Sequence, residues 1–184
     1  ASYCADLGLE RTASSALLGT DNPCSADGSI RKAAYDRLRW MIDCAHALQA
    51  ASICGPLYAP LGYFSGNGPT EAELSFAADT LRAAAEHAAL AGVKLVLEPL
   101  NRFETYVINT TEQGSAFTRR VGHRNVGYMY DTFHANIEER SPVGAFEKYA
   151  SEFAHIHISE NDRGIPGRGH AALASVIAAA RRSG

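Results

Sequence analysis

Three side chains of the types that bind divalent metal ions follow apolar runs in this 184-residue chain. Glu98 follows the run 93–97, Asp131 follows the run 126–130, and His157 ends the run 153–157. Each run has the length and the β-branched or aromatic content of a buried strand. In a parallel barrel the carboxyl ends of the strands meet at one mouth. Two carboxylates and an imidazole at that mouth predict a site for a divalent metal ion.

Neighbouring polar residues allow a different interpretation of the same positions. Arg102 lies between Glu98 and Glu104, and an ion pair with either carboxylate would explain it without a metal. A single histidine such as His134 is often structural. Residue alternation places His155 and His157 on one face of their strand, with only the second at its end. Ligand-type residues at equivalent ends of three successive strands favour the metal site over these alternatives.

The elements that would position these residues alternate regularly along the chain. Apolar periodicity and capping residues predict five strands and five helices. The strands are expected at 7–10, within 51–58 together with the turn that follows it, and at 93–97, 126–130 and 153–158. The helices are expected at 28–49, 70–90, 109–121, 142–152 and 171–182. Residues 12–27, 59–69 and 159–170 are rich in turn formers and are expected to be loops.

Strand–helix alternation repeated five times indicates a parallel sheet covered by helices. Either a (β/α)8 barrel or an open doubly wound sheet would fit the pattern. No G-x-G-x-x-G or Walker motif follows a strand, which disfavours nucleotide binding. The segment 164–169 resembles a phosphate-binding loop only loosely, because it lacks the Gly-Lys-Ser/Thr ending.

Composition excludes several classes of protein. Hydrophobic residues make up 46% of the chain and charged residues 20%, as in a globular domain. Residues 1–184 are expected to form a single domain. The net charge of −3 and the absence of a Lys/Arg cluster argue against a nucleic-acid partner. No apolar run approaches the ~20 residues of a membrane span, and the first residues do not resemble a signal peptide. The four cysteines form no C-x-x-C pair, so we expect reduced structural thiols in a cytoplasmic protein.

Four segments together resemble the ketose 3-epimerases, the D-tagatose/D-psicose 3-epimerase group of the xylose isomerase-like TIM barrels. They are Leu-Glu-Pro-Leu-Asn-Arg-Phe-Glu at 97–104, Asp-Thr-Phe-His-Ala-Asn-Ile-Glu-Glu at 131–139, His-Ile-His-Ile-Ser-Glu-Asn-Asp-Arg at 155–163 and Pro-Gly-Arg-Gly-His at 166–170. The resemblance implies an isomerase that inverts C3 of a small-molecule ketose by metal-assisted proton transfer through an enediolate. It also implies a divalent ion, usually Mn²⁺ but also Co²⁺ or Mg²⁺, and a homo-oligomeric full-length parent.

The resemblance assigns roles to individual positions. Glu98, Asp131 and His157 match three metal ligands of the family, and Glu98 also matches one of its two catalytic carboxylates. Three further positions match residues that hold the oxygens of the sugar, namely Glu104, His134 and Arg163. Specificity for one ketose is expected in the loops 12–27 and 59–69.

The chain departs from the family pattern at its ends. The family places a second Glu on the eighth strand, where it is both the fourth ligand and the other acid/base. We therefore expect a partial (β/α)8 TIM barrel of about five βα units, strands three to seven, which lacks the first two strands and the last. The alternatives are a hydroxypyruvate-isomerase-like aldose–ketose isomerase, an AP endonuclease of the same superfamily, and an inactive fragment without a complete metal site.

Overall fold

The computed structural model describes residues 2–183, and within them five strands form one parallel sheet in the order β1-β2-β3-β4-β5. The strands are β1 (Ala13–Ser14), β2 (Ser52–Gly55), β3 (Lys94–Leu97), β4 (Val126–Asp131) and β5 (Phe153–His157). The helices are α1 (Ser2–Asp6), α2 (Gly28–Ala47), α3 (Glu71–Ala91), α4 (Thr111–Val121), α5 (Thr132–Glu138), α6 (Pro142–Tyr149) and α7 (Leu173–Ser183), with a 3₁₀ turn at Ala150–Glu152. Strand order therefore follows chain order throughout the described sheet.

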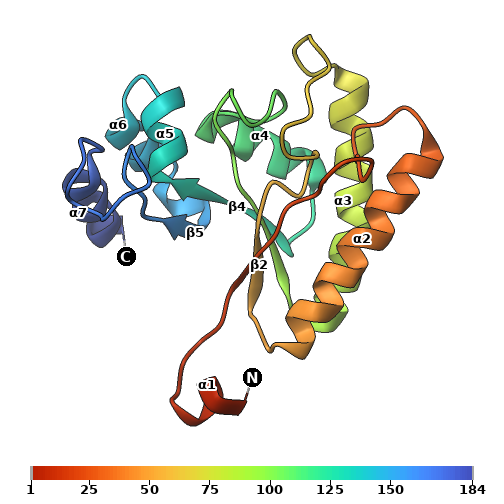
Figure 1. The fold of residues 1–184 in the computed structure, drawn as a ribbon, viewed down its shortest axis with the longest axis horizontal. Helices are drawn as coiled ribbons and strands as arrows, with labels where there is room; N and C mark the ends of the chain where they lie inside the picture. The colour runs from red at the N-terminus through yellow and green to blue at the C-terminus, as the bar shows by residue number, and fades with distance from the viewer. Residues whose placement is uncertain (1, 184) are drawn as a thin grey trace.

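One face of the sheet is covered by helices that pack in sequence, α2 on α3, α3 on α4, α4 on α6 and α6 on α7 (Figure 1). The core lies between this layer and the strands, where Ile53, Leu95 and Tyr128 are almost fully buried. A doubly wound sheet would reverse its strand order and carry helices on both faces. The observed arrangement is part of a (β/α)8 barrel, which confirms the predicted fold class.

Local signals fixed the helix boundaries. Asp27 caps α2 by accepting the backbone N–H of Ser29. Thr70 and Glu73 form a reciprocal capping box at the start of α3, and Gly92 ends that helix in the left-handed conformation. These contacts satisfy the free backbone groups at helix ends, so the predicted helices lie within a few residues of their expected positions.

The first predicted strand was wrong. Residues 7–10 are not a strand, and Leu7 and Leu9 are exposed. The first strand is instead Ala13–Ser14, inside the segment expected to be a loop. Pairing with β2 decides this, because the N–H of Ser15 donates to Cys54 and the N–H of Ala51 to Arg11. The short helices α1 and α5 were also not predicted, and α1 lies apart from the helix layer in Figure 1.

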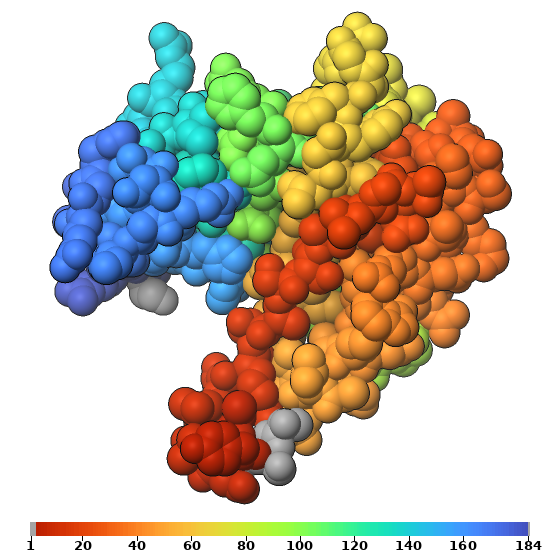
Figure 2. All heavy atoms as spheres, in the orientation of Figure 1, coloured from red at the N-terminus to blue at the C-terminus, as the bar shows by residue number. Residues whose placement is uncertain are grey.

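A close approach at Gly55 fixes the path of the N-terminal segment. The φ of Gly55 is +141°, and a Cβ built there would lie 1.9 Å from the backbone oxygen of Ser15. Only glycine allows the segment after β1 to cross the end of β2 at this distance. This segment, drawn in red, runs across the face seen in Figure 2 beside a notch that separates it from the blue C-terminal part.

Strand β5 carries one extra residue opposite β4. Tyr128 pairs with Phe153, whereas the next residue, Met129, pairs with His155, so Ala154 is the inserted residue of a β-bulge. Phe153 points to the helix-covered face, where its ring centroid lies 5.3 Å from that of Tyr128. Strict alternation from Phe153 would place His155 under the helices as well. The bulge turns it, and His157 after it, to the concave face.

Glycine at position 127 makes room for this bulge. A Cβ built on Gly127 would lie 2.7 Å from the Cβ of Ala154. The rings of His155 and His157 lie on the same face with centroids 5.1 Å apart, as predicted. No disulfide is present among the described cysteines, and no helix between residues 2 and 183 is long and apolar enough to cross a lipid bilayer.

Candidate active site

The ends of β3, β4 and β5 bring Glu98, Asp131 and His157 together. Nδ1 of His157 lies 3.1 Å from Oε1 of Glu98 and 3.6 Å from Oδ2 of Asp131. Glu98 is 8% exposed and Asp131 6%, so both carboxylates are largely removed from water. Buried carboxylates need a partner, and here both face the same ring nitrogen of His157.

Backbone contacts hold the two carboxylates in position. Oδ1 of Asp131 accepts the N–H groups of Phe133 and His134, which makes Asp131 the N-cap of α5 and leaves Oδ2 facing His157. The N–H of Glu98 donates to Gly55, and its carbonyl accepts the hydroxyl of buried Tyr58 at 3.0 Å. The short helix α5, which sequence patterns did not predict, thus fixes one carboxylate.

The charges of Glu98 and Asp131 beside His157 favour a bound cation. Hydrogen bonds with Asp131 and Glu98 raise the pKa of His157 to about 9. Burial favours a raised pKa for Asp131, but the bond from His157, the nearby His134 and two backbone amides outweigh it and lower that pKa. A proton on His157 therefore holds the two carboxylates together. Two oxygen donors and one nitrogen around one point fit a divalent cation in place of that proton.

His134 lies close to the same carboxylates, but neither nitrogen of its ring has a free lone pair for a metal ion. Donor atoms of Glu98, Asp131 and His134 lie within 4.8 Å of one another. However, Nδ1 of His134 accepts the backbone N–H of Asn101 at 3.0 Å, and a backbone amide can only donate. Burial lowers the pKa of His134 despite the opposing charge of Asp131, so its single proton is on Nε2. The geometry makes His134 a hydrogen-bond donor.

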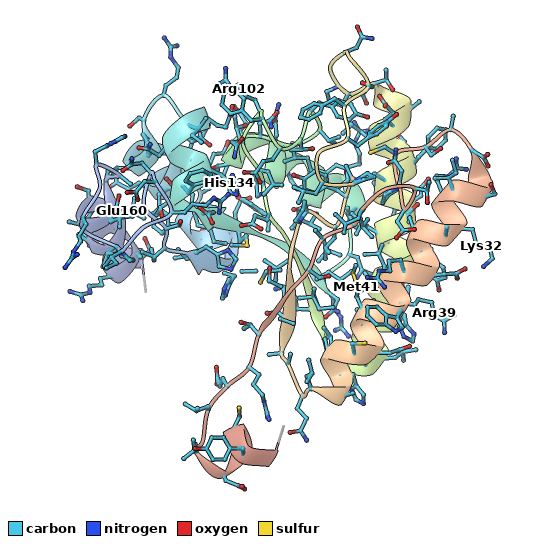
Figure 3. All side chains as sticks on the ribbon, in the orientation of Figure 1. Lys32, Arg39, Met41, Arg102, His134 and Glu160 are labelled. Atoms are coloured by element: carbon cyan, nitrogen blue, oxygen red, sulfur yellow. The ribbon has the colours of Figure 1, made fainter. Side chains whose placement is uncertain are left out.

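A chain of hydrogen bonds links the other expected residues. Oε1 of Glu104 accepts from the side-chain amide of Asn101 at 2.9 Å and from Nη2 of Arg163 at 3.1 Å. The guanidinium of Arg163 also stacks over the ring of Phe133 at 3.9 Å from its centroid. Figure 3 places His134 centrally, between the C-terminal loop that carries Glu160 and the strands. Asn101 thus links His134 to Glu104, and Glu104 links Asn101 to Arg163.

The simple ion-pair interpretation of Arg102 is wrong. Arg102 pairs with Glu138 on α5 at 2.9 Å, while Glu98 faces His157 and Glu104 faces Arg163. The side chain of Arg102 is largely exposed and points away from the site. The sequence showed a nearby arginine but not its partner, which lies 36 residues away.

One cavity of about 440 Å³ is lined by all six expected site residues. The remaining wall comes largely from the N-terminal segment and the loop after β2. These lining residues are Ser14, Ser15, Ala16, Pro56, Leu61 and Leu100. The volume is in the range of pockets that hold small ligands.

Two contributors were missed by sequence reasoning. Asn101 is 2% exposed and holds both His134 and Glu104, and Phe133 carries the guanidinium of Arg163. Arg163 itself has φ of +56°, a conformation that few residues other than glycine adopt. Of these three features, only the buried asparagine, which follows a predicted strand, could have been recognised from the sequence pattern.

Comparisons with known proteins identify relatives of this fold. The family model described as xylose isomerase-like TIM barrel matches residues 1–184. A D-psicose 3-epimerase of Ruminiclostridium cellulolyticum is 38% identical over 150 residues, which is 80% of this chain and 51% of that protein. An L-ribulose 3-epimerase of Methylomonas sp. is 32% identical over 174 residues, 95% of this chain and 60% of that protein.

A solved structure of an L-ribulose 3-epimerase superposes with a TM-score of 0.94 at 34% identity and covers 99% of this chain and 61% of that one. The chain therefore spans from about half to about three fifths of the length of these relatives.

Proposed function

The chain belongs to the xylose isomerase-like TIM barrel family, and on that premise we propose that the protein is a ketose 3-epimerase, an isomerase that inverts C3 of a small-molecule ketose. One observation carries the proposal. Glu98 and Asp131 converge on a single nitrogen of His157, in the wall of a cavity that Glu104, His134 and Arg163 also line. A cation site beside donors for oxygen is what proton transfer next to a carbonyl requires.

In this proposal Glu98, Asp131 and His157 hold a divalent ion, with Mn²⁺ preferred and Co²⁺ or Mg²⁺ as alternatives. When bound, such an ion supplies Lewis-acid polarisation of the C2 carbonyl, which acidifies the neighbouring C3–H. The mixed oxygen and nitrogen donors suit several of these ions.

The residues of the chain divide the remaining work. Glu98 moves the proton at C3. Its Oε1 faces His157, and its second carboxylate oxygen is the one that can take up the proton. The Nε2–H of His134 donates to an oxygen that becomes negative as the enediolate forms, and Arg163 stabilises the same charge. Glu104 holds Arg163 and Asn101 in place.

Inversion needs a second base on the opposite face of the enediolate. The family supplies it from an eighth strand, and we propose that residues 1–184 form a single domain within such a longer barrel. A relative named 3-dehydro-D-guloside 4-epimerase matches only 91 residues, half of this chain, and this shorter match gives no reason to prefer another position of the sugar. A homo-oligomeric state and a cytoplasmic location stay predictions.

Thermal unfolding with and without Mn²⁺ tests the metal site in the 184-residue chain. Binding to the native state raises the unfolding temperature, and we expect this for the unchanged chain but not for Glu98→Gln. Glu112→Gln, an exposed carboxylate on α4, is the matched control and should respond to Mn²⁺ as the unchanged chain does. An unfolding temperature that Mn²⁺ leaves unchanged would contradict the proposed site.

Epimerisation is tested in a barrel-length version of the protein with D-psicose and L-ribulose, the sugars named for the relatives. Glu98→Gln is expected to abolish inversion while the far-ultraviolet circular dichroism stays unchanged. Activity of that variant within about tenfold of the parent, a loss of less than ~1.4 kcal/mol in transition-state stabilisation, would contradict the role of Glu98.

A further inference from the structure

The concave face of the sheet carries a second group of ligand-type side chains beside the proposed active site. Cys54 on β2 and His155 and His157 on β5 have donor atoms that all lie within 4.8 Å of one another. Cys54 is buried beside Val96 and Met129, and His155 is partly buried. Neither Cys54 nor His155 has a part in the proposed epimerase reaction.

The bulge in β5 is what creates this group. Because Ala154 is the inserted residue, His155 pairs with Met129 and points to the concave face with Cys54. In a regular strand the same histidine would point away from the cysteine. Bulges commonly re-aim a side chain next to a functional site.

We propose that Cys54, His155 and His157 form a second metal site, specific for a borderline-soft divalent cation such as zinc. One thiolate and two imidazoles suit zinc, whereas the carboxylates of the neighbouring trio suit harder ions. The three ligand atoms in such a tetrahedral zinc site lie about 3.3–3.5 Å apart, by bond lengths of ~2.0 Å to nitrogen and ~2.3 Å to sulfur. Metal binding requires side-chain rotation that shortens the present separations, which are at most 4.8 Å, to that distance, and the fourth position stays open for water.

Binding of the cation at the second site breaks one covalent bond of the protein, the S–H bond of Cys54. The sulfur of Cys54 loses its proton to solvent when it binds the cation, and no other covalent bond changes. The hydroxyl of Ser52 lies 4.0 Å from this sulfur on the same face of β2. It is placed to donate to the thiolate as a supporting contact.

The two metal sites compete because they share His157. A neutral imidazole has a single lone pair available for a metal, so His157 serves one cation at a time. Zinc at the second site therefore removes one of the three ligands from the Glu98 and Asp131 set. This consequence, inhibition of the enzyme by zinc, rests on the proposed function, whereas the site itself does not.

Cobalt(II) is the probe for the thiolate ligand, because cobalt bound to sulfur gives an intense near-ultraviolet charge-transfer absorption. We expect this absorption to saturate at one equivalent in the 184-residue chain, to disappear in Cys54→Ser and to weaken in His155→Gln. Cys24→Ser is the matched control, since Cys24 is also buried but donates to the carbonyl of Tyr58 in another part of the fold. It should keep the absorption, and so should Glu98→Gln.

Calorimetric titration with zinc gives the second measurement. Zinc should bind the unchanged chain and lower its affinity for Mn²⁺, while Cys54→Ser should bind zinc roughly tenfold more weakly or worse and keep its Mn²⁺ affinity. Absence of the cobalt–thiolate absorption in the unchanged chain, or its persistence in Cys54→Ser, would overturn the second site. A cobalt–thiolate site in a chain that binds no Mn²⁺ would support this inference and contradict only the proposed function.

Discussion

At the scale of single residues, the site depends on which atom of each side chain is already occupied. Both His134 and His157 lie close to Glu98 and Asp131, and proximity alone would make both metal ligands. The backbone N–H of Asn101 occupies Nδ1 of His134, while Nδ1 of His157 faces only carboxylate oxygens. One histidine is therefore suited to donate a proton in a hydrogen bond, and the other to bind a cation.

The first residue-scale prediction separates these two roles. We expect His134→Gln to keep its affinity for Mn²⁺ within about threefold, and His157→Gln to lose roughly tenfold or more. Calorimetric titration of the two variants is the measurement. A comparable loss in both would show that His134 binds the metal.

The second residue-scale prediction concerns the pH dependence of the stability of the folded protein in the absence of metal. The folded pKa of His157, about 9, lies above its ordinary value of 6.5. The charged form therefore stabilises the folded protein fully below pH 6.5, and this contribution is lost as the pH rises through about 9. Thermal unfolding in chelator between pH 6 and 10 should show this decline, and His157→Gln should flatten it. A profile that is identical in the variant would contradict the assigned interaction.

At the scale of elements, the bulge in β5 decides which face of the sheet carries the histidines. Ala154 fits only because Gly127 on the neighbouring strand has no side chain. Helix α5 acts in the same way on the other side of the site, since its first N–H groups hold one oxygen of Asp131. These two small irregularities thus orient two of the three proposed ligands.

The substitution Gly127→Ala tests whether the bulge in β5 positions His157. The added methyl would lie 2.7 Å from the Cβ of Ala154, so the bulge must shift. We expect a loss of about 1–3 kcal/mol in the free energy of unfolding together with weaker Mn²⁺ binding, because His157 moves with the strand. Gly68→Ala is the control, as nothing lies within 4 Å of a Cβ built there. Unchanged metal affinity in Gly127→Ala would show that the bulge does not position His157.

At the scale of the whole molecule, the described sheet is a curved but open one. Strands β1 and β5 end it, and each has one edge without a partner strand among residues 2–183. The cavity is lined on one side by the proposed ligands and on another by the N-terminal segment that crosses at Gly55. Inversion at C3, by contrast, requires a base on each face of the sugar.

We accordingly expect the 184-residue chain to convert little or no ketose to its C3 epimer, even when saturated with Mn²⁺. Proton nuclear magnetic resonance in deuterium oxide, with D-psicose as the sugar, measures both exchange at C3 and formation of the epimer. Rapid formation of the epimer by this chain would contradict the need for a base from the eighth strand.

The sequence alone determined the strand–helix alternation, the helix caps and the polar residue at the end of each of three strands. These are local properties, because capping and apolar periodicity involve residues a few positions apart. The ion pair of Arg102 with Glu138 and the hydrogen bond of His134 with Asn101 join residues more than thirty positions apart, and no local pattern shows them. The two-residue strand β1 and the bulge at Ala154 exist only through pairing with a neighbouring strand. Tertiary structure therefore decided which face the histidines occupy and which of them is free to bind a cation.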